Sequence, residues 1–261
     1  MLKNRDPYEF PKNELKQEYN KYTNDDHEVW QILYSRQEEA LKDNATKDFF
    51  EGMKLCGFAS DKIPHIETVN DNLLKATGWQ TYVVPGLIAD KPFFQFLANK
   101  RFPVTTWIRK KHELEYLEEP DMFHDVYAHV PLLSIQSFVD FVQGLAKIAL
   151  KHIENAEAVE LLSRLYWFTV EFGLINEDNH LKIYGAGILS SIGESDYSVH
   201  DKNVPRYPYD VRHIFRTPYY KHDFQKQYFV IDSYEQLYES LDHIEEILED
   251  ELEKENVKIN N

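Results

Sequence analysis

The sequence predicts a single, mainly helical domain with a few short β-strands. Most segments repeat their apolar residues at intervals of three and four, as one face of an α-helix requires. Only brief runs carry the β-branched and aromatic side chains that are typical of strands. The chain has 261 residues, of which 43% are hydrophobic, and this suits one domain with a full core. No internal repeat, low-complexity segment or linker divides the sequence, so we expect residues 1–261 to form one domain.

In the N-terminal half, an irregular arm is expected before a series of helices. Residues 1–20 are polar and contain Pro7 and Pro11. The acidic pair Asp25-Asp26 suits the N-terminus of a helix. The apolar stripe of that helix is Trp30, Leu33, Tyr34, Gln37 and Leu41. The other expected elements are short helices over 46–77 broken near Ile63-Pro64, a strand over 79–84, a helix over 90–100 and a strand over 104–108.

In the C-terminal half, the patterns predict three longer helices and one strand. Four of the nine glycines lie between Gly173 and Gly193, so tight turns are expected there. The segment 200–223 is rich in Pro and Tyr and predicts a long ordered loop. The expected elements are a helix over 121–152 interrupted by Pro131, a helix over 156–172, a strand over 227–231 and an acidic helix over 233–261 with the stripe Leu237, Leu241, Ile244, Leu248 and Leu252.

Charge and cysteine content exclude several classes of partner. The 45 acidic and 29 basic residues give a net charge of −16, which repels phosphate backbones and anionic membranes. We therefore expect neither a nucleic-acid nor a membrane partner. Cys56 is the sole cysteine, which rules out an intrachain disulfide and suits a reducing compartment. The first residues, with Lys3 and Arg5, form no apolar run and hence no signal peptide, so a cytoplasmic protein is expected.

Two segments suggest a metal site. His124 and His129 are five residues apart, and five steps on an α-helix leave side chains roughly 140° apart. Such a pair converges only near a helix end or across a distorted turn. Glu171 lies among large apolar residues, and a buried carboxylate must be protonated, paired or metal-bound. Two histidines and one carboxylate form the facial triad of non-haem iron(II) oxygenases.

Taken alone, these residues leave other interpretations open. A zinc hydrolase uses the same three ligands. Glu171 could instead pair with an arginine or lysine. A non-catalytic helical module could bury the two histidines only to satisfy hydrogen bonds in its core.

The order of several longer blocks is more specific than any one motif. Together they resemble the pterin-dependent aromatic amino acid hydroxylases, the family of phenylalanine, tyrosine and tryptophan hydroxylases. The matching blocks are residues 26–30, 33–37, 77–79, 119–133, 166–174, 184–191 and 216–219. The arrangement is most similar to the short bacterial members, which act on phenylalanine and consist of the catalytic domain alone. The resemblance thus implies the catalytic-domain fold of this family, without a regulatory domain of the animal type.

The resemblance implies a role for each candidate residue of the metal and substrate sites. It makes His124, His129 and Glu171 the ligands of Fe(II). Arg109 would bind the substrate carboxylate, Asp121 would brace that arginine and Ser190 would add a hydroxyl donor. The substrate ring would lie against His124 and against the apolar side chains of Pro120, Trp167 and Phe172.

The resemblance also implies a site for a tetrahydropterin. Phe93 would stack on the pterin, with Phe94 as the alternative if the register differs by one residue. Backbone groups from Gly86 to Ile88 would contact the pterin edge, and Asp125 would reach it through water. One position departs from the family pattern: Ala128 stands where many members have glycine before the second histidine. A backbone that required glycine there would disturb the site.

The expected activity is the hydroxylation of L-phenylalanine to L-tyrosine with O2, Fe(II) and a tetrahydropterin such as tetrahydrobiopterin. Tyrosine or tryptophan hydroxylation is the alternative within the family, and a zinc hydrolase is the alternative from another class.

The leucine and isoleucine stripe of the acidic helix over 233–261 covers about four turns, which is short for a coiled coil. We therefore expect that helix to pack on its own domain and the protein to be a monomer.

Overall fold

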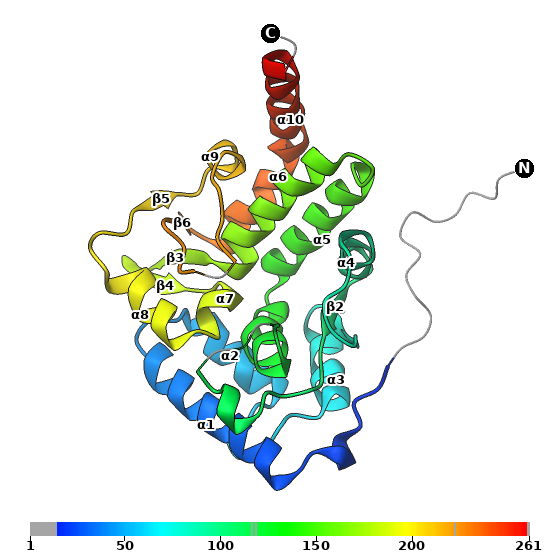
Figure 1. The fold of residues 1–261 in the computed structure, drawn as a ribbon, viewed down its shortest axis with the longest axis vertical. Coiled ribbons are helices and arrows are strands. Elements are labelled where there is room, and N and C mark those ends of the chain that lie inside the picture. The colour runs from blue at the N-terminus through cyan, green and yellow to red at the C-terminus, as the bar shows by residue number, and fades with distance from the viewer. Residues whose placement is uncertain (1–14, 116, 118, 222, 260–261) are drawn as a thin grey trace, which may run out of the picture.

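The computed structural model describes residues 15–115, 117, 119–221 and 223–259. It confirms the mainly helical class, with two small sheets set among the helices (Figure 1). Most of the arm expected at residues 1–20 lies outside the described residues. Its described end carries the short 3₁₀ helix η1 (Tyr19–Lys21).

The N-terminal helices begin where the sequence predicts. Helix α1 (Asn24–Leu41) is capped at Thr23, whose side chain accepts a hydrogen bond from the Asp26 amide, while the Asp26 carboxylate accepts one from the Thr23 amide. This reciprocal capping satisfies two amides that the first turn leaves unpaired. Helices α2 (Lys47–Cys56) and α3 (Ile66–Ala76) follow, with the break between them at the predicted place.

The smaller sheet contains two parallel strands, β1 (Gln80–Val83) and β2 (Arg101–Val104), joined by α4 (Asp90–Ala98). The prediction of a strand over 104–108 was wrong. The Thr105 amide donates to the Asp125 carboxylate at 2.7 Å instead of continuing the ladder. The chain therefore leaves the sheet at Thr105 and runs to the 3₁₀ helix η2 (Lys111–Glu113).

The centre of the molecule is helical but not uniformly α-helical. The π-helix η3 (Phe123–His129) is followed by the 3₁₀ helix η4 (Val130–Ser134) and by α5 (Gln136–Lys151). The α-helix predicted over 156–172 is shorter, because α6 (Ala156–Tyr166) changes at its end into the π-helix η5 (Trp167–Glu171).

The larger sheet has the strand order β4-β3-β6-β5. Its strands are β3 (Gly173–Glu177), β4 (His180–Ile183), β5 (Arg206–Pro208) and β6 (Tyr228–Ile231). Strand β6 confirms the strand predicted over 227–231. The hairpin of β3 and β4 occupies the stretch for which only tight turns were predicted.

Three short helices accompany this sheet. They are α7 (Ala186–Leu189), α8 (Ile192–His200) and α9 (Val211–Phe215). The segment 200–223 is therefore not one long loop, since it contains β5 and α9. The Asp210 side chain caps α9 by accepting a hydrogen bond from the His213 amide at 2.6 Å.

The C-terminal helix α10 (Tyr234–Ile259) begins where the acidic helix was predicted and projects beyond the other helices (Figure 1). Leu237, Ile244 and Leu248 of the predicted stripe are fully buried. Helix α10 packs on α5 at Gly144, where an added Cβ would lie 2.3 Å from a Leu241 methyl group. The stripe therefore packs on its own domain.

Among the described residues, no single helix is long and apolar enough to cross a membrane. The segments Phe123–Ser134 and Gln136–Lys151 pass that test only as a pair, bent by 112°.

Candidate metal centre and active-site pocket

The π-helical geometry of η3 explains how His124 and His129 converge. A π-helix bonds residue i to residue i+5, so its turn is wider than that of an α-helix and brings the fifth residue nearer to the same side. The two Nε2 atoms lie 3.2 Å apart. The sequence spacing did predict that convergence would need a distorted turn, and η3 is that turn.

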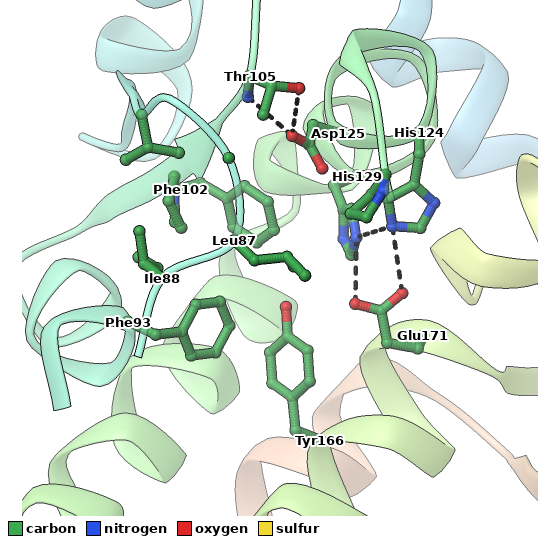
Figure 2. Close-up of a pocket in the computed structure, with 14 residues that line it drawn as sticks. Leu87, Ile88, Phe93, Phe102, Thr105, His124, Asp125, His129, Tyr166 and Glu171 are labelled. Carbon is green, nitrogen blue, oxygen red and sulfur yellow. Dashed lines mark hydrogen bonds and ion pairs between the residues drawn. The ribbon is translucent and has the colours of Figure 1, made fainter. Parts of the chain in front are cut away.

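Glu171 reaches the two histidines from the end of η5 (Figure 2). Its Oε1 lies 3.2 Å from His129 Nε2, and its Oε2 lies 3.6 Å from His124 Nε2. The Glu171 side chain is 14% exposed. Among the described residues, its ion-pair partners are these two histidines, so the pairing with an arginine or lysine is not found there.

The donor set fits one divalent metal ion. The three ligand atoms lie within 4.8 Å of one another. Neighbouring ligands around an octahedral ion, with bonds of about 2.0–2.2 Å, are about 3 Å apart, close to the separations seen here. Three protein ligands also leave coordination positions open for other molecules.

Hydrogen bonding assigns the proton of His124 to the nitrogen that faces away from this cluster. Ser190 Oγ lies 2.8 Å from His124 Nδ1 and donates to the Ala186 carbonyl at 2.9 Å. Because the hydroxyl proton is used there, Nδ1–H must donate to Oγ, which leaves the Nε2 lone pair directed at the cluster. Ser190 thus lies behind a predicted ligand, and its hydroxyl would have to turn before it could donate to a substrate.

The protonation states also suit a metal site. Burial lowers the pKa of His124 to about 4, so its imidazole is neutral near pH 7. For Glu171, burial raises the pKa, but the neighbouring His129 and His124 outweigh it, and the net pKa is lowered. A neutral imidazole beside an ionised carboxylate is the form in which these groups bind metals.

Arg109 and Asp121 form a bidentate pair next to this cluster. Arg109 Nε and Nη2 donate to the two carboxylate oxygens of Asp121 at 2.9 and 2.8 Å. Asp121 is fully buried, and its Oδ1 also accepts from the amides of Phe123 and His124 at 3.1 and 3.3 Å. One carboxylate therefore holds both the start of η3 and the guanidinium.

A pocket of about 140 Å³ opens beside the cluster (Figure 2). All four residues predicted for the pterin line it, together with Pro120 and the three candidate metal ligands; the four are Phe93, Gly86, Ile88 and Asp125. Asp125 accepts from the amide and hydroxyl of Thr105 at 2.7 and 2.8 Å. Phe94 is 2% exposed and does not line the pocket, which favours the register that uses Phe93.

The structure also brings residues into the pocket that the sequence reasoning missed. Tyr166 and Leu87 both line it, and the Tyr166 hydroxyl is directed towards the cavity (Figure 2). Nothing in the sequence singled out Tyr166, since a tyrosine before a helix end is ordinary core. Leu87 is 73% exposed and lies within the predicted backbone stretch from Gly86 to Ile88, but its side chain was not predicted to line the pocket.

The predicted walls for an aromatic ring lie on η5 and just after it. The rings of Trp167 and Phe172 stack with centroids 4.8 Å apart. The centroid of the Tyr219 ring also lies 4.8 Å from that of Trp167.

Ala128 is fully buried inside η3. Among the described residues, positive φ angles outside glycine occur at Lys100, Asp178 and Asn179, so the backbone at Ala128 does not require glycine.

A mainly helical domain with two histidines and one carboxylate beside a pocket has the donor set of a non-haem iron oxygenase. The chain belongs to the biopterin-dependent aromatic amino acid hydroxylase family, whose model matches residues 11–256. Membership of this family does not favour the zinc hydrolase or the non-catalytic module.

The most similar proteins include two bacterial enzymes. The phenylalanine-4-hydroxylase of Ralstonia nicotianae is 45% identical over 226 residues, which cover 87% of this chain and 72% of the relative. That of Chromobacterium violaceum is also 45% identical, over 87% of this chain and 76% of the relative. The Chromobacterium violaceum structure with bound oxidised Fe(III) superposes with a TM-score of 0.86 at 44% identity, over 90% of this chain and 85% of that one.

Proposed function

We propose that this protein hydroxylates L-phenylalanine to L-tyrosine, using O2, Fe(II) and a tetrahydropterin. One observation carries the proposal: His124, His129 and Glu171 converge beside an aromatic-lined pocket. They do so in a chain 45% identical to enzymes that act on phenylalanine. When bound, the iron would activate O2 and the reduced pterin would supply two electrons.

In this proposal, His124, His129 and Glu171 hold the iron, and Ser190 keeps His124 in the tautomer that binds it. Arg109 binds the substrate carboxylate with the side of its guanidinium that faces away from Asp121. Its fixed charge and planar donors suit a carboxylate. The paired contacts to Asp121 support this role because they fix the guanidinium plane.

The walls of the proposed ring site favour phenylalanine. Pro120, Trp167 and Phe172 would surround the ring, and none of their groups there pairs with a phenol. Burying a tyrosine hydroxyl unpaired would cost about 1–3 kcal/mol, or roughly 5- to 150-fold in kcat/KM. Phe93 would stack on the pterin, the backbone at Gly86 and Ile88 would contact its edge, and Asp125 would reach it through water.

A product assay tests the proposal. The protein, loaded with Fe(II) and supplied with tetrahydrobiopterin and O2, receives equal concentrations of phenylalanine, tyrosine and tryptophan. Each amino acid is supplied in a separate reaction, because tyrosine is both a product and a substrate. We expect tyrosine to form from phenylalanine faster than dihydroxyphenylalanine forms from tyrosine or 5-hydroxytryptophan from tryptophan. Faster formation of either other product would make the substrate assignment wrong. No hydroxylation of any of the three would contradict the proposed function.

We further propose that the protein acts as a monomeric, single catalytic domain in the cytoplasm, on small molecules rather than nucleic acid or membranes. One continuous core that extends from Val29 to Leu248 supports the single domain. The packing of α10 on α5 supports the monomer. The buried, unpaired thiol of Cys56 suits a reducing compartment.

A further inference from the structure

Behind the proposed ring site, Gln225 is fully buried, and its side-chain amide makes all the hydrogen bonds that it can. Its Oε1 accepts from the Trp167 indole N–H and from the Tyr220 amide, both at 3.1 Å. Its Nε2 donates to the carbonyls of Tyr220 and Asp223. An amide side chain has two donors and two acceptor lone pairs, so every one of them is used.

These contacts join two separate structures. On one side, the amide bonds to the backbone of Tyr220 and Asp223, shortly before Gln225 in the chain. Towards Trp167, it holds the indole that stacks on Phe172, next to Glu171. The same indole lies against Tyr219, the neighbour of Tyr220. One side chain is therefore bonded both to the tryptophan and to the residue next to the tyrosine that packs on it.

Gln225 is itself anchored from the opposite side. The backbone N–H of Gln225 donates to Glu194 Oε1 at 3.0 Å, and the Tyr228 hydroxyl donates to the same oxygen at 2.7 Å. Glu194 is 5% exposed. A buried group with all its hydrogen bonds made has little freedom to move, so the position of Gln225 is well defined.

We propose that Gln225 is a positioning residue for the aromatic substrate: it orients the Trp167 indole and ties Tyr220 to it, and so shapes the wall of the ring site. This inference rests on the proposed function for the identity of the substrate. The orientation of Trp167 by Gln225 is independent of it.

The first experiment measures the orientation directly. The chain has four tryptophans, so 15N labelling gives four indole N–H signals, and Trp167→Phe assigns one of them. In Gln225→Met, which keeps the side-chain length but removes the amide, we expect the Trp167 signal to shift and its hydrogen to exchange faster, with the other three unchanged. Gln227→Met is the matched control, because Gln227 donates to Thr217 instead.

The second experiment measures the consequence for the substrate. Loss of one net hydrogen bond corresponds to about a 3- to 10-fold effect. We expect Gln225→Met to raise the KM for phenylalanine by that factor, with the pterin KM and iron content unchanged. In a Trp167→Phe background, the same change should add less than 2-fold, because residues that act through each other are not additive.

Several outcomes would overturn the proposal. They are an unchanged Trp167 indole signal in Gln225→Met, an equal KM change in Gln227→Met, and full additivity with Trp167→Phe. If Gln225→Met does not fold, wild-type exchange decides, since the Trp167 indole should exchange far more slowly than that of exposed Trp107. Equal rates would contradict the proposal. Failure to hydroxylate phenylalanine would refute the proposed function but leave the indole measurements valid.

Discussion

The guanidinium of Arg109 has two sides with different surroundings. Nε and Nη2 bond to Asp121, which is fully buried and also holds the first amides of η3. The other side faces away from this pair. Because Asp121 fixes the guanidinium plane before any substrate arrives, little side-chain entropy remains to be lost on binding a carboxylate.

Replacing Arg109 with lysine should therefore weaken substrate binding. A lysine gives a single point charge in place of a planar fork, and we expect the KM for phenylalanine to rise about 10- to 100-fold. Steady-state kinetics would measure this, with Arg101→Lys as a control away from the site. If wild-type protein used phenylalanine amide as well as phenylalanine, Arg109 would not bind the carboxylate.

Phe93 provides the prediction for the pterin side of the pocket. Its ring lines the cavity opposite the metal cluster (Figure 2), and loss of one aromatic contact costs about 0.5–1.5 kcal/mol. Phe93→Ala should raise the pterin KM roughly 2- to 10-fold while iron content stays the same. Phe94→Ala tests the alternative register. A change confined to the amino acid KM would show that Phe93 does not contact the pterin.

Single residues were predictable where the sequence carried a chemical reason for them. His124, His129 and Glu171 could be proposed from ligand chemistry, and the structure brings their ligand atoms together. Tyr166 has no such chemistry on its own, because a tyrosine before a helix end is ordinary core. Its place in the pocket depends on the turn that follows it.

At the scale of elements, the π-helices are what α-helical periodicity could not predict. Hydrophobic spacing of three and four is similar in both helix types over a single turn, so η3 and η5 were predicted as α-helix. The spacing of five between His124 and His129 was evidence for a wider turn. No comparable pair of ligand residues indicated η5.

The hairpin of β3 and β4 was missed for a different reason. The glycines of this stretch suggested turns, although the decisive residues were Asp178 and Asn179, with φ angles of 51° and 62°. Positive φ at both central positions characterises the two-residue turn of a β-hairpin. Since Glu177 pairs with His180, the Asp-Asn pair was the available signal.

Helix α10 is joined to the rest of the domain by Glu251, whose side chain is 10% exposed. Its Oε2 accepts from Arg216 Nε at 2.7 Å, and Oε1 accepts from Arg212, Arg216 and Lys254. These cations lower the pKa of Glu251 to about 2. Arg216 lies three residues before Tyr219, whose ring packs against Trp167. This cluster of ion pairs around Glu251, called the clamp below, therefore connects α10 to the chain beside Trp167.

Glu251→Gln should destabilise the protein by about 1 kcal/mol, or ~2–4 °C in Tm, after allowance for solvent around the arginines. Because the folded-state pKa is lowered, the carboxylate stabilises the fold fully above about pH 4.5, and this is lost as the pH falls towards 2. The difference from wild type should thus shrink below about pH 4.5. Thermal unfolding between about pH 7 and pH 2 measures it, with exposed Glu253→Gln as control. An equal deficit at every pH would contradict the clamp.

On the scale of the whole molecule, the proposed metal site joins parts of the chain that are distant in sequence. His124 and His129 come from η3, before α5, whereas Glu171 comes from η5, after α6. Ser190, which holds His124, follows α7. The family comparison confirmed the fold class, but this convergence could not be derived from the sequence alone, because it depends on how α5 and α6 return the chain to η3.

Because the ligands come from separate elements, metal binding should stabilise the entire fold. A ligand that binds only the folded state adds RT ln(1 + [L]/Kd), about 2.7 kcal/mol at a hundredfold excess over Kd. For a domain of this size that corresponds to roughly 5–10 °C in Tm. Co(II), which does not oxidise readily in air and is bound by the Chromobacterium violaceum relative, is a suitable probe.

We expect Co(II) to raise the Tm of the metal-free protein by roughly 5–10 °C and to have no such effect on His129→Ala or Glu171→Ala. His180→Ala, a change at an exposed histidine of β4, should respond like wild type. Equal stabilisation of all four proteins would mean that Co(II) binds elsewhere, and the three residues would then not form the metal site.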